Sequence, residues 1–84
     1  MRVQAEVSLY PLRRPSLAES VNRFLEHLGR TGLRVRPGPM SSQIEGAVGE
    51  VFGGLAEAFE AAANDADVVM VVKVSNACPK DVPT

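Results

Sequence analysis

Hydrophobic and polar residues alternate at the start of the chain, and this pattern predicts a β-strand. Four apolar residues occupy every second position of an eight-residue segment: Val3, Ala5, Val7 and Leu9. A period of two is typical of a strand that buries one face. Pro11 lacks the backbone N–H that a sheet ladder needs, so we expect the strand to end there.

The period then changes to that of a helix over residues 16–30. Ser16 and Glu19 have the spacing of a capping box, in which the hydroxyl and the carboxylate satisfy backbone N–H groups of the first turn. The apolar residues that follow recur three or four positions apart: Leu17, Val21, Phe24 and Leu28. This spacing predicts one buried helical stripe. Gly29 and Gly32 are typical of a helix C-terminus.

Two short alternating segments, residues 33–36 and 40–45, flank the turn-forming sequence Pro37-Gly38-Pro39. Strands so close together are expected to pair as a hairpin. In the second strand one side would carry Met40, Ser42 and Ile44, and the other Ser41, Gln43 and Glu45. We expect this strand to end at Gly46.

A second helical period covers residues 48–64. Its apolar members are Val48, Val51, Phe52, Leu55, Phe59 and Ala62. Gly53 and Gly54 lie inside this helix, where each glycine costs about 1 kcal/mol relative to alanine. Their presence indicates the close approach of another element, either the sheet or a second subunit.

Residues 68–74 are almost continuously apolar, which predicts a final strand that is covered on both faces. The order β-α-β-β-α-β predicts an α+β, ferredoxin-like fold: a four-stranded antiparallel sheet with two helices on one face. We expect a single domain over residues 1–75 and an irregular tail over residues 76–84.

This architecture leaves one face of the sheet without helices. Alternate residues of the last strand would face the helices: Val68, Met70, Val72 and Val74. Val69, Val71 and Lys73 would then point to the opposite face, which is half apolar. A second subunit or a ligand would cover such a surface, and we therefore predict a homo-oligomer.

Composition narrows the classes of function. The formal net charge of the 84 residues is −1, and Tyr10 is the only aromatic residue on the expected strands, which disfavours a nucleic-acid-binding sheet. No apolar run is long enough to span a membrane, and the N-terminus does not resemble a signal peptide. The single cysteine, Cys78, excludes an internal disulfide and is typical of a cytoplasmic protein.

Catalytic and metal-binding patterns are missing from the sequence. His27 is the only histidine and has no second soft ligand near it, so we expect no metal site. Cys78 has no neighbouring base, and no phosphate-binding glycine loop occurs. No nucleophile, base and orienting group can be assigned together, so we expect a protein that is not an enzyme and needs no cofactor.

Candidate binding residues occur on the first and third strands, which are neighbours in the expected fold. The polar side chains there are Ser8, Tyr10, Ser41, Ser42, Gln43 and Glu45. Hydroxyl, amide and carboxylate groups beside an apolar floor could bind a small polar heterocycle. Ordinary solvated strand residues would give the same pattern. A structural or regulatory oligomerisation domain that binds a protein partner through its open sheet face is the alternative function.

Three segments resemble, in order and spacing, motifs of the small thiamine-binding (YkoF-like) protein family. They are Ser8-Leu9-Tyr10-Pro11-Leu12, Gly38-Pro39-Met40-Ser41-Ser42-Gln43-Ile44-Glu45-Gly46 and Val71-Val72-Lys73-Val74. The similarity covers residues 3 to about 75 of the chain.

The resemblance implies a ferredoxin-like fold, dimers or tetramers formed through the sheets, and binding of thiamine or its hydroxymethylpyrimidine portion. Its motifs place the ligand-binding residues at Ser8, Tyr10, Ser41, Ser42, Glu45 and Lys73. An aminopyrimidine has ring-nitrogen acceptors and an amino donor, with which hydroxyls and a carboxylate can pair. The thiazolium is cationic, so Glu45 or the ring of Tyr10 could attract it.

Overall fold

Six elements follow one another in the order that the periodicity predicts. The computed structural model describes residues 1–13, 17–64 and 66–77; the expected capping residue Ser16 and the tail from Cys78 onwards lie outside them. The elements are β1 (Arg2–Pro11), α1 (Leu17–Arg30), β2 (Arg34–Pro37), β3 (Ser42–Ala47), α2 (Val48–Ala63) and β4 (Val68–Ser75).

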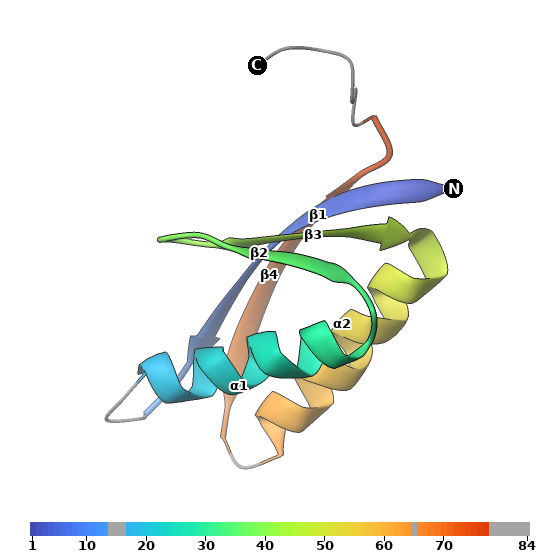
Figure 1. Cartoon of the computed structure of the whole chain (residues 1–84). Helices are drawn as coiled ribbons and strands as arrows, with labels where there is room; N and C mark the ends of the chain where they lie inside the picture. The colour runs from blue at the N-terminus through green and yellow to red at the C-terminus, as the bar shows by residue number, and fades with distance from the viewer. Residues whose placement is uncertain (14–16, 65, 78–84) are drawn as a thin grey trace.

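The four strands form one antiparallel sheet in the order β2-β3-β1-β4. Both helices pack on the same side of this sheet (Figure 1). The ferredoxin-like α+β fold is therefore confirmed. The predicted hairpin is also confirmed, because β2 pairs with β3 from Arg34 opposite Glu45 to Pro37 opposite Ser42.

The core lies between the helices and the sheet. All four alternating apolar residues of β1 are buried in it, together with Ile44 of β3. Two members of the apolar set expected in the second helix are exposed instead, since Val48 and Phe52 lie on the outer side of α2. The buried residues that the helices contribute are Phe24, Leu28, Val51, Leu55 and Ala58.

The third strand starts later than its alternation predicts. It begins at Ser42 instead of Met40, and it continues through Gly46 to Ala47. Met40 belongs to the loop between β2 and β3 and is 88% exposed. A Cβ atom on Gly38 would lie 2.6 Å from the carbonyl oxygen of Ser41, so the loop turns tightly before pairing can start.

The facing of β4 agrees with the prediction. Val68, Met70 and Val72 pack against the core, whereas Val69, Val71 and Lys73 point to the face without helices and are exposed. Val74 follows the same alternation as Val72, but 38% of it is exposed. Coverage of the second face of β4 by another molecule stays a prediction.

Leu33 fills the space between the β2–β3 hairpin and α2. A Cβ atom on Gly46 of β3 would lie 2.8 Å from Leu33 Cδ2, and one on Gly54 of α2 would lie 2.8 Å from Leu33 Cδ1. Both distances are shorter than van der Waals contact. The close approach predicted for α2 is therefore confirmed at Gly54, whereas Gly53 faces open space.

The two adjacent glycines of α2 should respond oppositely to alanine. Gly53→Ala should stabilise the fold by about 0.5–1 kcal/mol, because alanine favours the helix and nothing obstructs the methyl group. Gly54→Ala should be less stable than Gly53→Ala by about 1–3 kcal/mol, because Leu33 cannot move away from Gly54 without approaching Gly46. Urea unfolding of both variants measures the difference, and equal stabilities would contradict this packing.

Candidate functional site

The face of the sheet that carries no helix, here the open face, divides into two halves. Its polar half consists of two cross-strand rows, Arg34–Glu45–Gln4–Ser75 and Arg36–Gln43–Glu6–Lys73. Its apolar half consists of two shorter rows, Ser8–Val71 and Tyr10–Val69. The apolar rows contain β1 and β4 alone, because β3 begins opposite Val7.

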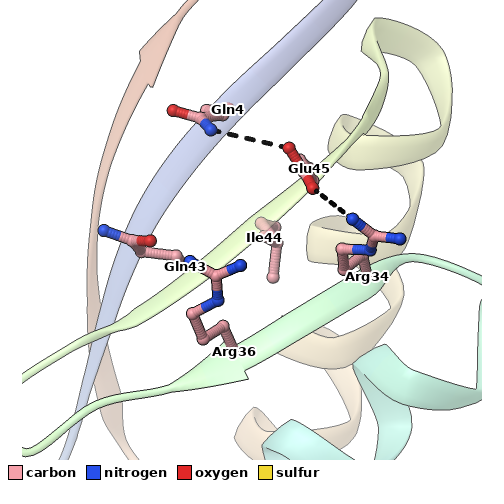
Figure 2. A pocket seen from close by; sticks show the side chains of 6 residues that line it. All are labelled: Gln4, Arg34, Arg36, Gln43, Ile44 and Glu45. Carbon is pink, nitrogen blue, oxygen red and sulfur yellow. Dashed lines mark hydrogen bonds and ion pairs between the residues drawn. The ribbon is translucent and has the colours of Figure 1, made fainter. Parts of the chain in front are cut away.

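Hydrogen bonds and ion pairs connect the polar half. Gln4 Nε2 donates to Glu45 Oε2 at 3.5 Å, and Arg34 Nη1 donates to Glu45 Oε1 at 3.3 Å (Figure 2). Lys73 Nζ lies 3.7 Å from Glu6 Oε1 in the neighbouring row. The hydrogen bond from Gln4, and then the positive charge of Arg34, lower the pKa of Glu45 below its ordinary value of 4.5.

The apolar half leaves large hydrocarbon side chains in contact with solvent. Tyr10, Val69 and Val71 are each 45–50% exposed, although they lie on adjacent strands of a regular sheet. Backbone pairing continues beneath them as far as Pro11 opposite Val68. The half-apolar surface expected from the alternation is therefore present, and these three side chains form its centre.

A hollow of about 300 Å³ lies on the helix side, where β1 extends beyond the start of β3. Its walls are the end of β1, the middle of α1 and the loop between β2 and β3. The hollow combines hydroxyl and amide groups with an apolar floor. The lining residues are Val7, Ser8, Leu9, Val21, Asn22, Phe24, Leu25 and residues 37–42.

The six residues expected to bind a ligand do not form one cluster. Ser41 and Ser42 line the hollow from the β2–β3 loop and the start of β3. Ser8 borders the hollow from β1, although its side chain alternates with those of Val7 and Leu9 and so points to the open face. The others lie on the open face: Tyr10 in the apolar half, and Glu45 and Lys73 in the polar half.

Ser42 and Glu45 are separated by the sheet itself. Ser42 pairs with Val7 and is 6% exposed, so its side chain lies on the helix side. Glu45 is three positions further along β3, and its side chain lies on the open face beside Gln4. One small ligand in the hollow therefore cannot contact both side chains.

The structure adds residues that the motifs do not include. Asn22 reaches the hollow from α1, at the position after the predicted buried residue Val21. Arg34 and Arg36 lie beside Glu45 and Gln43 only through the register of the hairpin. The alternation of residues 33–36 already indicates that these two arginines share a face, but not which residues they meet.

Neither a metal site nor a membrane span occurs in the described part of the chain. Residues 1–13, 17–64 and 66–77 contain no group of three or more His, Cys, Asp or Glu side chains that could hold a metal ion. Within the same ranges, neither helix is long and apolar enough to cross a membrane. His27 lies in the last turn of α1 and does not line the hollow.

The hydrogen bond to Gln4 can be tested through the titration of Glu45. Gln4→Leu should raise the pKa of Glu45, whereas Gln43→Leu on the same face should not. Because the folded pKa is lowered, the stabilising contribution of this carboxylate is present above the ordinary pKa and is lost as pH falls through the folded pKa. Carboxyl ¹³C NMR measures the shift, and an equal pKa in both variants would refute the assignment.

Comparisons with known proteins bear on the fold and the family of this chain. The model of the thiamine-binding protein family matches residues 5–82. The crystal structure of hypothetical protein MJ1052 from Methanocaldococcus jannascii is 30% identical, with a TM-score of 0.84 over 95% of this chain and 84% of that chain. No curated protein matches the sequence.

Two further crystal structures share the fold at lower identity. TM0486 from Thermotoga maritima, named as a candidate thiamine biosynthesis/salvage protein, is 20% identical with a TM-score of 0.80 over 88% of this chain and 82% of that one. SP2199 from Streptococcus pneumoniae is 20% identical with a TM-score of 0.87 over 98% and 93%. The match of the family model over most of its length shows that this chain belongs to the thiamine-binding protein family.

Proposed function

We propose that this protein binds thiamine, or its hydroxymethylpyrimidine portion, in the hollow between α1 and the β2–β3 loop, and that it does so without catalysis or a cofactor. The observation that carries the proposal is the meeting of Ser41 and Ser42 with the end of β1 at Ser8 in that hollow. The family is named for thiamine binding, and the name of TM0486 relates that protein to thiamine biosynthesis or salvage.

The chemistry of the lining matches an aminopyrimidine. The hydroxyls of Ser41 and Ser42 and the side-chain amide of Asn22 can each donate and accept hydrogen bonds, so they can pair with ring nitrogens and with an exocyclic amino group. Phe24 and Leu25 supply apolar surface for the faces of the ring. An aromatic ring held between apolar walls and oriented by a few polar groups is the usual arrangement of a small-molecule site.

The size of the hollow favours the smaller part of thiamine. About 300 Å³ is the lower end of the usual range for ligand pockets, roughly 300–1,000 Å³. We propose that the pyrimidine enters the hollow and that the thiazolium stays nearer its mouth. The positive charge of the thiazolium then needs no buried counter-ion, which agrees with a lining that contains no carboxylate among the described residues.

Hydroxyl removal should weaken binding. The double variant Ser41→Ala/Ser42→Ala should bind hydroxymethylpyrimidine about tenfold or more weakly than the wild type, because each hydrogen bond contributes about 0.5–1.5 kcal/mol. The matched control is Ser20→Ala, since Ser20 lies on α1 but lines a separate hollow with Ala61 and Ala62 of α2. Calorimetric titration of the three proteins measures the affinities.

Two outcomes would contradict the ligand proposal. The first is the absence of thermal stabilisation of the wild type by thiamine or hydroxymethylpyrimidine at millimolar concentration. A ligand at 100 times its dissociation constant should add about 2.7 kcal/mol to the free energy of unfolding. The second is equal affinity in the wild type and in the double variant, which would place the ligand elsewhere.

A second copy of this chain is the partner that we propose for the apolar half of the open face. Tyr10, Val69 and Val71 form an exposed patch on otherwise regular strands, and burying it would stabilise an assembly. The same patch supports the alternative that a different protein binds there and that the domain is structural or regulatory. We expect the assembly, a dimer or tetramer, to work in the cytoplasm.

Charge in the apolar half should separate the subunits. Val71→Glu should reduce the mass measured by light scattering toward that of the 9.0 kDa chain, because the carboxylate would have to be desolvated in the contact. The control is Phe52→Glu, which places the same charge on an exposed apolar residue of α2. A wild-type protein that is monomeric at tens of micromolar would contradict the proposed assembly.

A further inference from the structure

The polar half of the open face carries an excess of positive charge on a protein whose net charge is negative. Three cations belong to its two rows, and Arg2 extends the same face at the start of β1, close enough to lower the pKa of Glu45. Among the described residues, the carboxylates of the polar half are those of Glu6 and Glu45. The cations are Arg2, Arg34, Arg36 and Lys73.

Both carboxylates of the polar half already have cationic partners. Glu45 accepts hydrogen bonds from Gln4 and Arg34, and Glu6 lies 3.7 Å from Lys73. Within the described residues, Arg36 forms no ion pair and no side-chain hydrogen bond. Its guanidinium therefore keeps its N–H donors available for a ligand.

Arg36 lines a small pocket above β3. The pocket has a volume of about 80 Å³, and its other lining residues are Gln4, Arg34, Gln43, Ile44 and Glu45. Figure 2 shows the Arg36 guanidinium lying over the sheet beside Gln43, with Arg34 on the same side of the strands. The pocket is too small for a heterocycle, but it offers two guanidinium groups and two amides to a compact group.

We propose that this pocket binds a phosphoryl group, with Arg36 as its principal ligand. A guanidinium presents its donors in a planar fork that matches two oxygens of a phosphate, and Arg34 and the Gln43 amide can donate to the others. Glu45 does not repel the anion as an unpaired carboxylate would, because it accepts hydrogen bonds from Arg34 and Gln4. The site is reached from the sheet edge, since β2 is the outermost strand.

The phosphoryl group has two sources, a free phosphate ion or a phosphate ester of the ligand in the hollow. A shallow depression of about 440 Å³ follows the β2–β3 loop and shares Arg36 and Gln43 with the pocket. It also shares residues 37–41 with the hollow. A ligand bound in the hollow could therefore place a phosphate ester beside Arg36, by way of the depression along the β2–β3 loop. Only this second source of the phosphoryl group, the ester form, rests on the proposed function.

Pyrophosphate is the first probe. The wild type should bind it saturably, and Arg36→Gln should bind it roughly 10- to 100-fold more weakly, because a hydrogen-bonded charge pair is lost. Arg30→Gln is the matched control: it removes the same charge from an exposed residue in the last turn of α1. Calorimetry at constant ionic strength gives the affinities. No saturable binding at about 10 mM, or equal weakening in both variants, would overturn the site.

Thiamine and thiamine diphosphate then distinguish the two sources. If the ester form is correct, the diphosphate should bind more tightly than thiamine, and Arg36→Gln should remove that advantage without changing the affinity for thiamine. If pyrophosphate binding depends on Arg36 and the diphosphate has no advantage, the pocket accepts free phosphate and the ester form is overturned. A protein that binds pyrophosphate but no thiamine would refute the proposed function and retain the phosphoryl site.

Discussion

The unequal lengths of neighbouring strands create both the hollow beside α1 and the apolar half of the open face. β1 pairs with β4 as far as Pro11 but with β3 only as far as Val7. Beyond that point the end of β1 has a strand neighbour on one side alone. On the helix side the missing neighbour leaves the hollow beside α1, and on the open face it leaves the narrow apolar half. Both features follow from the late start of β3, which begins only after the tight loop at Gly38.

The hairpin that creates this step is held from the helix layer. Leu33 lies between Gly46 and Gly54 and packs so closely on both that a Cβ atom on either glycine would lie 2.8 Å from its side chain. In a closely packed protein interior, the displacement of one side chain displaces its neighbours. The position of the β2–β3 loop, and with it the shape of the hollow, therefore depends on a contact outside the site.

Periodicity predicts the elements and the facing of β4, because side-chain direction depends only on local geometry. Periodicity alone does not predict which of the candidate site residues lie close together in space. Alternation in β3 already places Ser42 and Glu45 on opposite sides, yet their closeness in the motif favours treating them as one cluster. Arg34 and Arg36 acquire their neighbours from the hairpin register, and Asn22 acquires its place from the packing of α1. These are tertiary relations, which no local pattern contains.

Ser8 connects the two parts of the molecule that we propose to be functional. It lines the hollow at the free edge of β1, and it is also paired with Val71 in the apolar half of the open face. A second subunit in contact with Val71 would therefore lie next to Ser8, which borders the proposed ligand site. Assembly and ligand binding would then involve the same part of β1. Contact with a second subunit would restrict the motion of the end of β1, which has no strand neighbour on the β3 side beyond Val7.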